Sequence, residues 1–169
     1  MTISDTFKKT AIKTWFRLSD AQEMKMTLGE ETITDINLLE ISRARHPEIS
    51  IKKFNKHEEG ENGADWEFWL TGKSGKWIGL RIQAKIINTK SGEYEQLHYK
   101  RDGVKQTEKL IANAKKDNAI PLYCLYTMHD FLRERHIPCR CMNEIYGCSL
   151  VDAFVVSELK NKNHIQDLM

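Results

Sequence analysis

The chain has 169 residues, of which 40% are hydrophobic and 30% are charged, and its formal net charge is +2. These values fit one domain over residues 1–169 with a sizeable core, and the near balance of charge decides nothing about nucleic acid as a partner. No apolar run approaches the roughly 18 residues that a membrane helix needs, and the first residues do not resemble a signal peptide. We therefore expect a cytoplasmic protein without membrane contact.

The first predicted elements are two helices. Apolar residues recur at helical spacing near the start of the chain, which predicts an amphipathic helix over residues 4–22. A glycine follows, and a second helix is expected to run to about residue 44, with Thr32 or Thr34 as its N-cap. A His-Pro pair at 46–47 is expected to end this helix.

Four later segments have the composition of strands: residues 49–54, 63–70, 77–87 and 121–126. Residues 104–116 have a helical pattern, and residues 55–62 and 88–93 are expected to be polar loops. The order is helix, strand, strand, strand, helix, strand, which predicts an α/β fold with a mixed sheet flanked by helices. This core spans about residues 30–126, and a cysteine-containing C-terminal extension follows at 127–169, in which residues 150–159 are expected to form a helix or a strand.

Asp65, Gln83 and Lys85 lie on two consecutive predicted strands. Gln83 and Lys85 are two residues apart and point the same way, and Asp65 can lie beside them if the two strands pair as a hairpin. Mg²⁺ prefers oxygen ligands, which the carboxylate, the amide and the backbone carbonyl of Ala84 can supply. A metal-bound water is easier to deprotonate, and a lysine can hold that water or a phosphate. The alternative is a cross-strand ion pair with a structural role.

The element order, with Gly-x-Asp at residues 63–65 and Gln-x-Lys at residues 83–85, resembles the restriction-endonuclease-like PD-(D/E)xK nuclease superfamily in its Mrr-like Gln-x-Lys variant. The resemblance implies a nuclease that cleaves DNA, or RNA, with Mg²⁺ or Mn²⁺, in phage defence, restriction or repair. It implies Asp65 and Gln83 as metal ligands and Lys85 as the catalytic lysine. Because glutamine is neutral where the common pattern has an acid, the metal site is expected to need another carboxylate.

Several glutamates compete for this role. The superfamily often places a glutamate on the helix before the sheet, and Glu31 and Glu40 are the candidates. Glu31 is preferred, because the first turn of that helix can face the open end of the sheet. Glu67 follows the strand aspartate by two residues and shares its face, so it is a further metal-ligand candidate. Glu58 and Glu59 can contribute only if their loop folds back.

A basic segment follows the predicted third strand. Lys105 and Lys109 are one helical turn apart, which indicates either phosphate contact beside the site or an ordinary solvated face. Gln106 matches a polar residue that the superfamily often has on this helix. Because the domain has a single site, double-strand cutting would require a homodimer or two separate events. Targeting is expected to come from a partner protein or from the shape of the substrate. The alternative function is an inactive nuclease-fold module that binds nucleic acid or a protein.

The C-terminal third of the chain contains one possible zinc-ligand set: His136, Cys139, Cys141 and Cys148. One histidine and three cysteines can form a structural zinc site. However, Cys-x-Cys followed by a distant cysteine is not a standard zinc-finger spacing. We therefore expect reduced thiols here, with a structural zinc site as the alternative.

Overall fold

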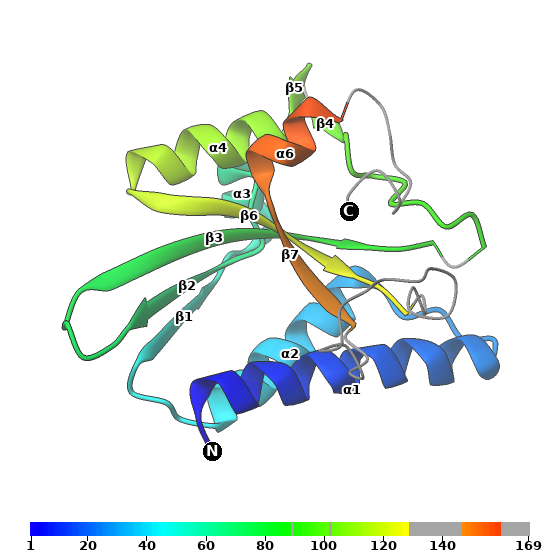
Figure 1. Cartoon of the computed structure of the whole chain (residues 1–169). Coiled ribbons are helices and arrows are strands. Elements are labelled where there is room, and N and C mark those ends of the chain that lie inside the picture. Colours follow the sequence, from blue (N-terminus) through cyan, green and yellow to red (C-terminus); the bar gives the residue numbers. More distant parts are fainter. Residues whose placement is uncertain (89, 102, 129–146, 160–169) are drawn as a thin grey trace, which may run out of the picture.

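The computed structural model describes residues 1–88, 90–101, 103–128 and 147–159. Their elements, in chain order, are α1 (Ile3–Glu23), α2 (Glu30–Arg43), β1 (Ile49–Lys53), α3 (Lys56–Asn62), β2 (Trp66–Thr71), β3 (Trp77–Ile86), β4 (Lys100–Arg101), β5 (Val104–Lys105), α4 (Gln106–Lys116), β6 (Ala119–Tyr126), β7 (Cys148–Asp152) and α6 (Ala153–Glu158). Figure 1 shows their arrangement.

A five-stranded mixed sheet in the order β1-β2-β3-β6-β7 forms the centre of the described structure. β1, β2 and β3 form an antiparallel meander, in which Trp66 pairs with Ile82. β6 is parallel to β3, and the chain between them passes through α4, whereas β7 is antiparallel to β6. The prediction of an α/β fold with a mixed sheet flanked by helices is thus confirmed.

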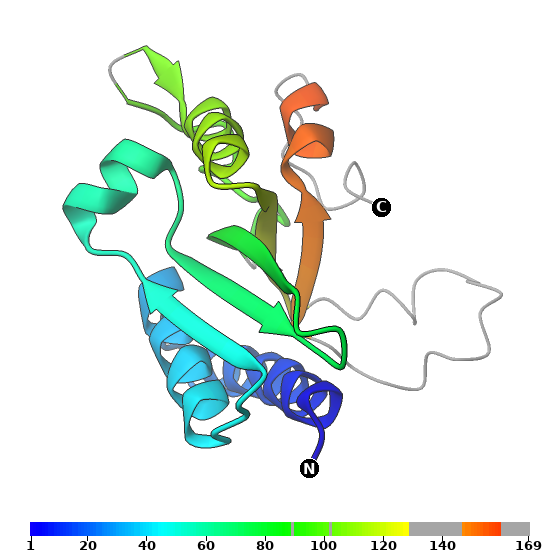
Figure 2. The same ribbon diagram turned by 90° about the vertical axis from the view of Figure 1, so that its left-hand side faces the viewer.

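The two faces of the sheet are covered by different helices. α1 and α2 lie on one face, and α4 and α6 lie on the other (Figures 1 and 2). Because side chains of a strand alternate between faces, β6 contributes to both cores. Tyr123 and Leu125 pack in a cluster with Leu110 of α4, while Cys124 and Tyr126 pack in a cluster with residues of α1 and α2. This alternation fixes which side chains of the neighbouring β3 face which helices.

The start of α2 differs from the prediction. The helix begins at Glu30 with Gly29 as its N-cap, so the assignment of Thr32 or Thr34 as the cap was wrong. Thr34 is instead a buried residue inside the helix. Its hydroxyl lies 2.9 Å from the carbonyl oxygen of Glu30 and 3.0 Å from the hydroxyl of Tyr126. This tertiary contact holds the first turn of α2 against the end of β6.

Residues 56–62 form the helix α3, so the prediction of a polar loop over 55–62 was wrong. The side chain of Asn55 accepts hydrogen bonds from the backbone N–H groups of His57 and Glu58. The Glu58 side chain accepts from the backbone N–H of Asn55 at 2.9 Å, which completes a capping box. The Asn-x-x-Glu pattern was therefore the signal in the sequence for this helix.

The C-terminal extension contributes a strand to the sheet. Its predicted segment 150–159 contains both a strand and a helix, β7 and α6, joined at Asp152, whose side chain accepts from the backbone N–H of Phe154 at 2.7 Å. Ala153 and Val156 of α6 are fully buried in the cluster beside α4. The packed structure therefore extends beyond the predicted core of residues 30–126.

Candidate active site

Asp65 lies directly before β2 and opposite Gln83 of β3. Its backbone N–H donates to the carbonyl of Ile82 at 2.8 Å, which continues the β2–β3 pairing. Its Oδ2 atom accepts hydrogen bonds from Nε2 of Gln83 at 2.8 Å and from the backbone N–H of Ala84 at 2.5 Å. The hairpin geometry expected for these residues is thus confirmed.

The three predicted residues line one cavity of about 300 Å³, here called the Asp65 cavity. It is polar, and its walls come from α2, β1, α3, β3, the segment before β4, and α4. Its lining residues are Glu30, Glu31, Thr34, Lys53, Lys56, Glu59, Asp65, Gln83, Lys85, Gln96, Tyr99 and Gln106. Carboxylates and lysines from separate elements therefore meet around the end of β3.

Gly63 determines how closely α3 and α4 approach each other beside Asp65. It ends α3 with a φ of 74°, in the left-handed region that favours glycine. A Cβ atom at this position would lie 2.7 Å from the backbone oxygen of Gln106 and 2.8 Å from the backbone nitrogen of Leu110. Lys109 of α4 also donates to the carbonyl of Gly60 at 2.9 Å. The start of α4 is therefore held against the segment that leads to Asp65.

This packing brings Gln106 to Gln83. Nε2 of Gln106 donates to Oε1 of Gln83 at 2.6 Å, and Nε2 of Gln83 donates to Oδ2 of Asp65 and to the carbonyl of Ala84 at 3.0 Å. Oε1 of Gln106 is buried and has no hydrogen-bond partner among the described residues. The expected proximity of Gln106 to the site is confirmed, although its role stays a prediction.

The hydrogen-bonded side chains of Gln106, Gln83 and Asp65 can accommodate a cation with oxygen ligands after one simple change. Half a turn of both glutamine amides exchanges their N and O atoms. Oε1 of Gln83 then faces Oδ2 of Asp65 and the carbonyl of Ala84, while Nε2 of Gln83 donates to Gln106. Three oxygens would then converge where one N–H group now lies, and such a set suits Mg²⁺ or Mn²⁺. In the described part of the chain, no three His, Cys, Asp or Glu side chains group closely enough to hold a metal ion, so amide and carbonyl ligands would be needed.

Glu30 is the helix glutamate that reaches the end of β3. Its Oε2 atom accepts from the backbone N–H of Ile86 at 3.1 Å, and its Oε1 atom lies 3.8 Å from Nζ of the buried Lys85. Glu31, the predicted candidate, also lines the cavity, but its side chain is 59% exposed and pairs with Lys56 at 3.0 Å. Sequence reasoning missed Glu30 because it placed the start of α2 too late in the chain.

The other glutamate candidates lie in different surroundings. Glu40 pairs with Arg17 of α1 at 2.5 Å and does not line the Asp65 cavity. Glu67 is buried and forms an ion pair with Arg81, whose Nε donates at 2.6 Å; it does not line the cavity either. We therefore leave Glu67 out of the proposed ligand set.

The α3 helix brings a carboxylate and a lysine to the cavity that the loop prediction did not place there. Glu59 and Lys56 both line it, because α3 packs back towards α4. Glu58 instead completes the capping box and pairs with Lys52 at 3.4 Å. Lys53 of β1 also lines the cavity, so its lysines come mainly from elements before the Asp65 strand.

Three carboxylates in the cavity have raised pKa values. Burial raises the pKa of Asp65 to about 6, and the nearby charge of Glu30 acts in the same direction. Burial also raises the pKa of Glu30 and of Glu59, and the charge of Asp65 contributes to the shift of Glu59. Desolvation disfavours the charged form of each acid, and a bound cation would reverse this penalty. Such perturbed groups in one cavity are typical of functional sites.

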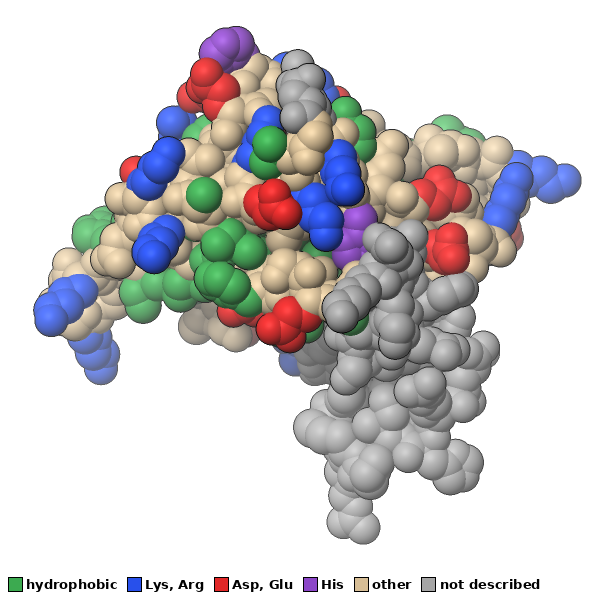
Figure 3. Space-filling model, turned by 90° about the horizontal axis from the view of Figure 1, so that it is seen from above, with side chains coloured by type: hydrophobic (Ala, Val, Ile, Leu, Met, Phe, Trp, Pro, Cys, Tyr) green, Lys and Arg blue, Asp and Glu red, His purple; other side chains and the backbone are tan. Residues whose placement is uncertain are grey.

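The predicted basic residues Lys105 and Lys109 do not line the Asp65 cavity. Lys109 is half-buried and bonds to Gly60, whereas Lys105 lies in the short β4–β5 pair opposite Lys100. On the face seen from above in Figure 3, Lys and Arg side chains are interspersed with Asp and Glu and form no single patch among the described residues. This face of the described structure therefore offers no extended basic surface to a nucleic acid.

The candidate zinc set lies mostly outside the described residues. This applies to His136, Cys139 and Cys141, so their arrangement stays a prediction. Cys148 is described at the start of β7, where Nδ2 of Asn37 lies 3.9 Å from its Sγ atom. It is half-buried and packs against the cluster between the sheet and the helices α1 and α2.

The fold and the cavity together define an α/β protein with an acid-, amide- and lysine-lined site at the centre of a mixed sheet. The chain belongs to the family described as a family of unknown function (DUF6615), whose model matches residues 3–169. No curated protein matches the sequence. Within the described residues, no helix is long and apolar enough to cross a membrane.

Proposed function

We propose that this protein is a metal-dependent nuclease that hydrolyses phosphodiester bonds. The observation that carries the proposal is the meeting of Asp65, Gln83 and Lys85 in one cavity, with Glu30 beside Lys85. DNA is the first expected substrate and RNA the second. The proposal is supported by chemistry, because oxygen ligands next to a buried lysine suit the cleavage of a phosphodiester by water.

The order of the elements gives further support. Helix α2, strands β1, β2 and β3, helix α4 and strand β6 occur in the order of the restriction-endonuclease-like pattern that the sequence resembles, with α3 inserted after β1 and the short β4–β5 pair inserted before α4. Asp65 precedes the second of these strands, and Gln83 and Lys85 are near the end of the third. The likeness concerns topology and three residues, so it supports the activity as an analogy.

The residues of the cavity can divide the work. Asp65, Gln83 and the carbonyl of Ala84 would hold Mg²⁺ or Mn²⁺, which when bound supplies an activated water and positive charge at the phosphate. Lys85 would donate hydrogen bonds to a phosphate oxygen or to the attacking water. Glu30 orients Lys85, and burial raises its pKa, so it is suited to accept a proton from that water.

The structural alternative accounts for less of the geometry. A cross-strand ion pair would join Lys85 to Asp65, whereas the ion pair of Lys85 is with Glu30 of α2. An inactive binding module remains the second candidate function. It predicts affinity for nucleic acid that is retained in Lys85→Ala and no cleavage with any divalent cation.

The deciding experiment incubates the purified protein with supercoiled plasmid, linear DNA and RNA, in Mg²⁺, Mn²⁺ or EDTA. We expect cleavage only with a divalent cation, and a loss of at least about 100-fold in Asp65→Ala and Lys85→Ala. Asp20→Ala and Lys116→Ala alter exposed residues outside the cavity and serve as matched controls, with activity within about twofold of the wild type. Undiminished cleavage by both site variants would contradict the assignment.

A further inference from the structure

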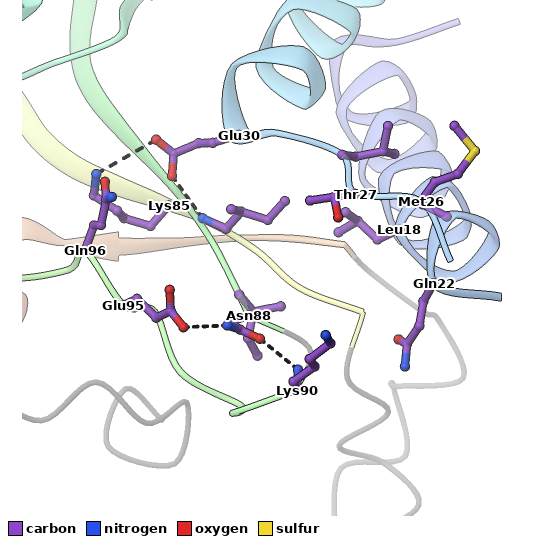
Figure 4. A pocket seen from close by; sticks show the side chains of 14 residues that line it. Leu18, Gln22, Met26, Thr27, Glu30, Lys85, Asn88, Lys90, Glu95 and Gln96 are labelled. Carbon is purple, nitrogen blue, oxygen red and sulfur yellow. Dashed lines mark hydrogen bonds and ion pairs between the residues drawn. The ribbon is translucent and has the colours of Figure 1, made fainter. Parts of the chain in front are cut away.

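A second cavity of about 520 Å³ adjoins the Asp65 cavity, and we call it the α1–β3 cavity. It lies between the end of α1, the connection to α2, the end of β3 and the segment that follows β3. Figure 4 shows Lys85 and Glu30 along one side, Gln22 and Met26 across from them, and Asn88 along another side. The two cavities share Glu30, Lys85 and Gln96 in their linings, so they adjoin each other at the Glu30–Lys85 ion pair.

The lining of the α1–β3 cavity combines apolar walls with neutral polar groups. The apolar residues are Leu18, Ala21, Met26, Leu28, Ile86 and Ile87. Gln22, Thr27, Asn88 and Gln96 supply amides and a hydroxyl, which carry both donors and acceptors. The volume is within the roughly 300–1,000 Å³ that is usual for pockets that bind small molecules.

The charges of this cavity are balanced. Glu30 pairs with Lys85, and the remaining charged residues in the lining are one acid, Glu95, and one base, Lys90. A phosphate group would favour a net positive lining, which this cavity lacks. Apolar walls with neutral donors and acceptors instead suit a planar, uncharged ring that has polar edges, such as a nucleobase.

A third cavity, here the α3–α4 cavity, adjoins the other side of the Asp65 cavity and has a different lining. It has a volume of about 360 Å³ and contains Lys56, His57 and Lys109, with Glu59 as the acid in its lining. It shares Lys56, Glu59, Tyr99 and Gln106 with the Asp65 cavity. The proposed cleavage site thus lies between a neutral cavity and a basic one, as expected if the first takes a base and the second takes backbone phosphates.

We infer that the α1–β3 cavity binds one unpaired nucleobase next to the scissile phosphate, so that the substrate is single-stranded nucleic acid. The inference rests on the proposed nuclease function. A base inside a duplex is stacked and paired, and it reaches a concave pocket only after it is extruded, which costs energy. An unpaired strand avoids this cost, and its bases can turn away from the backbone into the cavity.

The test is a binding measurement in EDTA, so that no metal-dependent cleavage takes place. The probes are fluorescein-labelled 12-nucleotide single strands of DNA and RNA, the DNA duplex of the same sequence, and an abasic oligomer of the same length. Thr27→Trp and Gln22→Trp each place an indole in the cavity from an exposed position, and Met24→Trp is the matched control on the same connection outside the lining. Thermal unfolding checks that each variant is folded.

We expect the wild type to bind at least one single strand at least tenfold more tightly than the duplex and the abasic oligomer. Thr27→Trp and Gln22→Trp should weaken single-strand binding at least tenfold, and Met24→Trp by less than twofold. Equal binding of base-containing and abasic strands, equal binding of single strand and duplex, or unchanged affinity in both cavity variants would overturn the inference. Equal cleavage of duplex and single strand by the wild type would also overturn the inference, and it would leave the nuclease proposal intact. The absence of any cleavage would overturn the nuclease proposal, and with it the placement of the base beside a scissile phosphate. The binding result, which is obtained without metal, would still decide whether the cavity takes an unpaired base.

Discussion

Gln83 donates a hydrogen bond from its side-chain amide to the carboxylate of Asp65 at 2.8 Å, across the β2–β3 pair. The common pattern of the superfamily that the sequence resembles has a carboxylate in place of this glutamine. Two carboxylates at this separation would repel each other until a cation bound between them. The amide instead lets the metal-free protein close the site with a hydrogen bond, so a metal has to compete with that bond.

This competition can be tested with Gln83→Glu. We expect the variant to bind Mn²⁺ about tenfold more tightly, because a second carboxylate is added to the ligand set. Without metal, its free energy of unfolding should fall by about 1–2 kcal/mol, since one hydrogen bond is replaced by repulsion. Calorimetric titration with Mn²⁺ measures the first effect, and denaturant unfolding in EDTA measures the second. Unchanged Mn²⁺ affinity would show that residue 83 does not contact the metal.

Glu30 and Glu31 are adjacent, so their glutamine variants form a matched pair. Glu30→Gln should lower the rate of cleavage at least tenfold, because Glu30 orients Lys85 at the end of β3. Glu31→Gln should change the rate by less than about threefold, because Glu31 is exposed and pairs with Lys56. Initial rates on a labelled oligonucleotide at saturating Mg²⁺ measure both. A larger loss of cleavage rate in Glu31→Gln than in Glu30→Gln would instead support Glu31, which the sequence analysis preferred, as the glutamate of the site.

Glu67 is expected to matter for stability and not for catalysis. Glu67→Ala leaves the buried guanidinium of Arg81 with Asp117 as its remaining carboxylate partner. We expect a loss of about 3 kcal/mol in the free energy of unfolding, because one partner of a buried pair is removed. The rate per folded molecule should stay within twofold. Asp117→Asn alters the exposed partner of the same arginine and should cost less than about 1 kcal/mol.

The pKa of Asp65 gives the metal-free protein a pH-dependent stability. Burial raises this pKa from 3.8 to about 6, so the folded protein binds the proton more tightly than the unfolded chain does. The resulting stabilisation is full below about pH 4 and is lost as the pH rises through 6. We expect wild type to lose about 2 kcal/mol relative to Asp65→Asn between pH 4 and pH 7, after allowance for partial exposure of the group.

The comparison is made by denaturant unfolding in EDTA at several pH values. Taking the difference between wild type and Asp65→Asn removes the contributions of carboxyls such as Glu40 and Glu58, whose pKa values are lowered. Asp20→Asn is the control and should follow the wild-type curve. If the difference in the free energy of unfolding between wild type and Asp65→Asn stays constant from pH 4 to pH 7, the pKa of Asp65 is not raised.

The site geometry was predictable where it depends on local rules. The period of a strand places Gln83 and Lys85 on one side, and pairing of β2 with β3 places Asp65 opposite Gln83. No long-range information is needed for this step, because the two strands are consecutive. The same is true of α3, because its capping box joins Asn55 to Glu58, which are three residues apart in the sequence.

The remaining features depend on contacts between distant segments. Glu30 reaches the site because its carboxylate accepts a hydrogen bond from the backbone N–H of Ile86, 56 residues later in the chain. The strand β7 joins the sheet beside β6, although the segment between them gave no clear pattern. Likewise, Glu67 shares a strand face with Asp65, but only the position of Arg81 explains its orientation. The periodicity of a strand predicts which face a side chain lies on, but it does not predict which distant residue that side chain contacts.

The arrangement of the site depends on Gly63, although this residue has no reactive group of its own. The residue has no side chain, and that is why the backbone of α4 can lie against the end of α3. A methyl group there would push apart the two helices that carry Glu59 and Gln106 to either side of Asp65. The positions of Glu59 and Gln106 in the cavity thus depend on one atom, a Cβ, that is missing from a neighbouring residue. An alanine at this position would test the spacing of the site while leaving every one of its reactive groups in the chain.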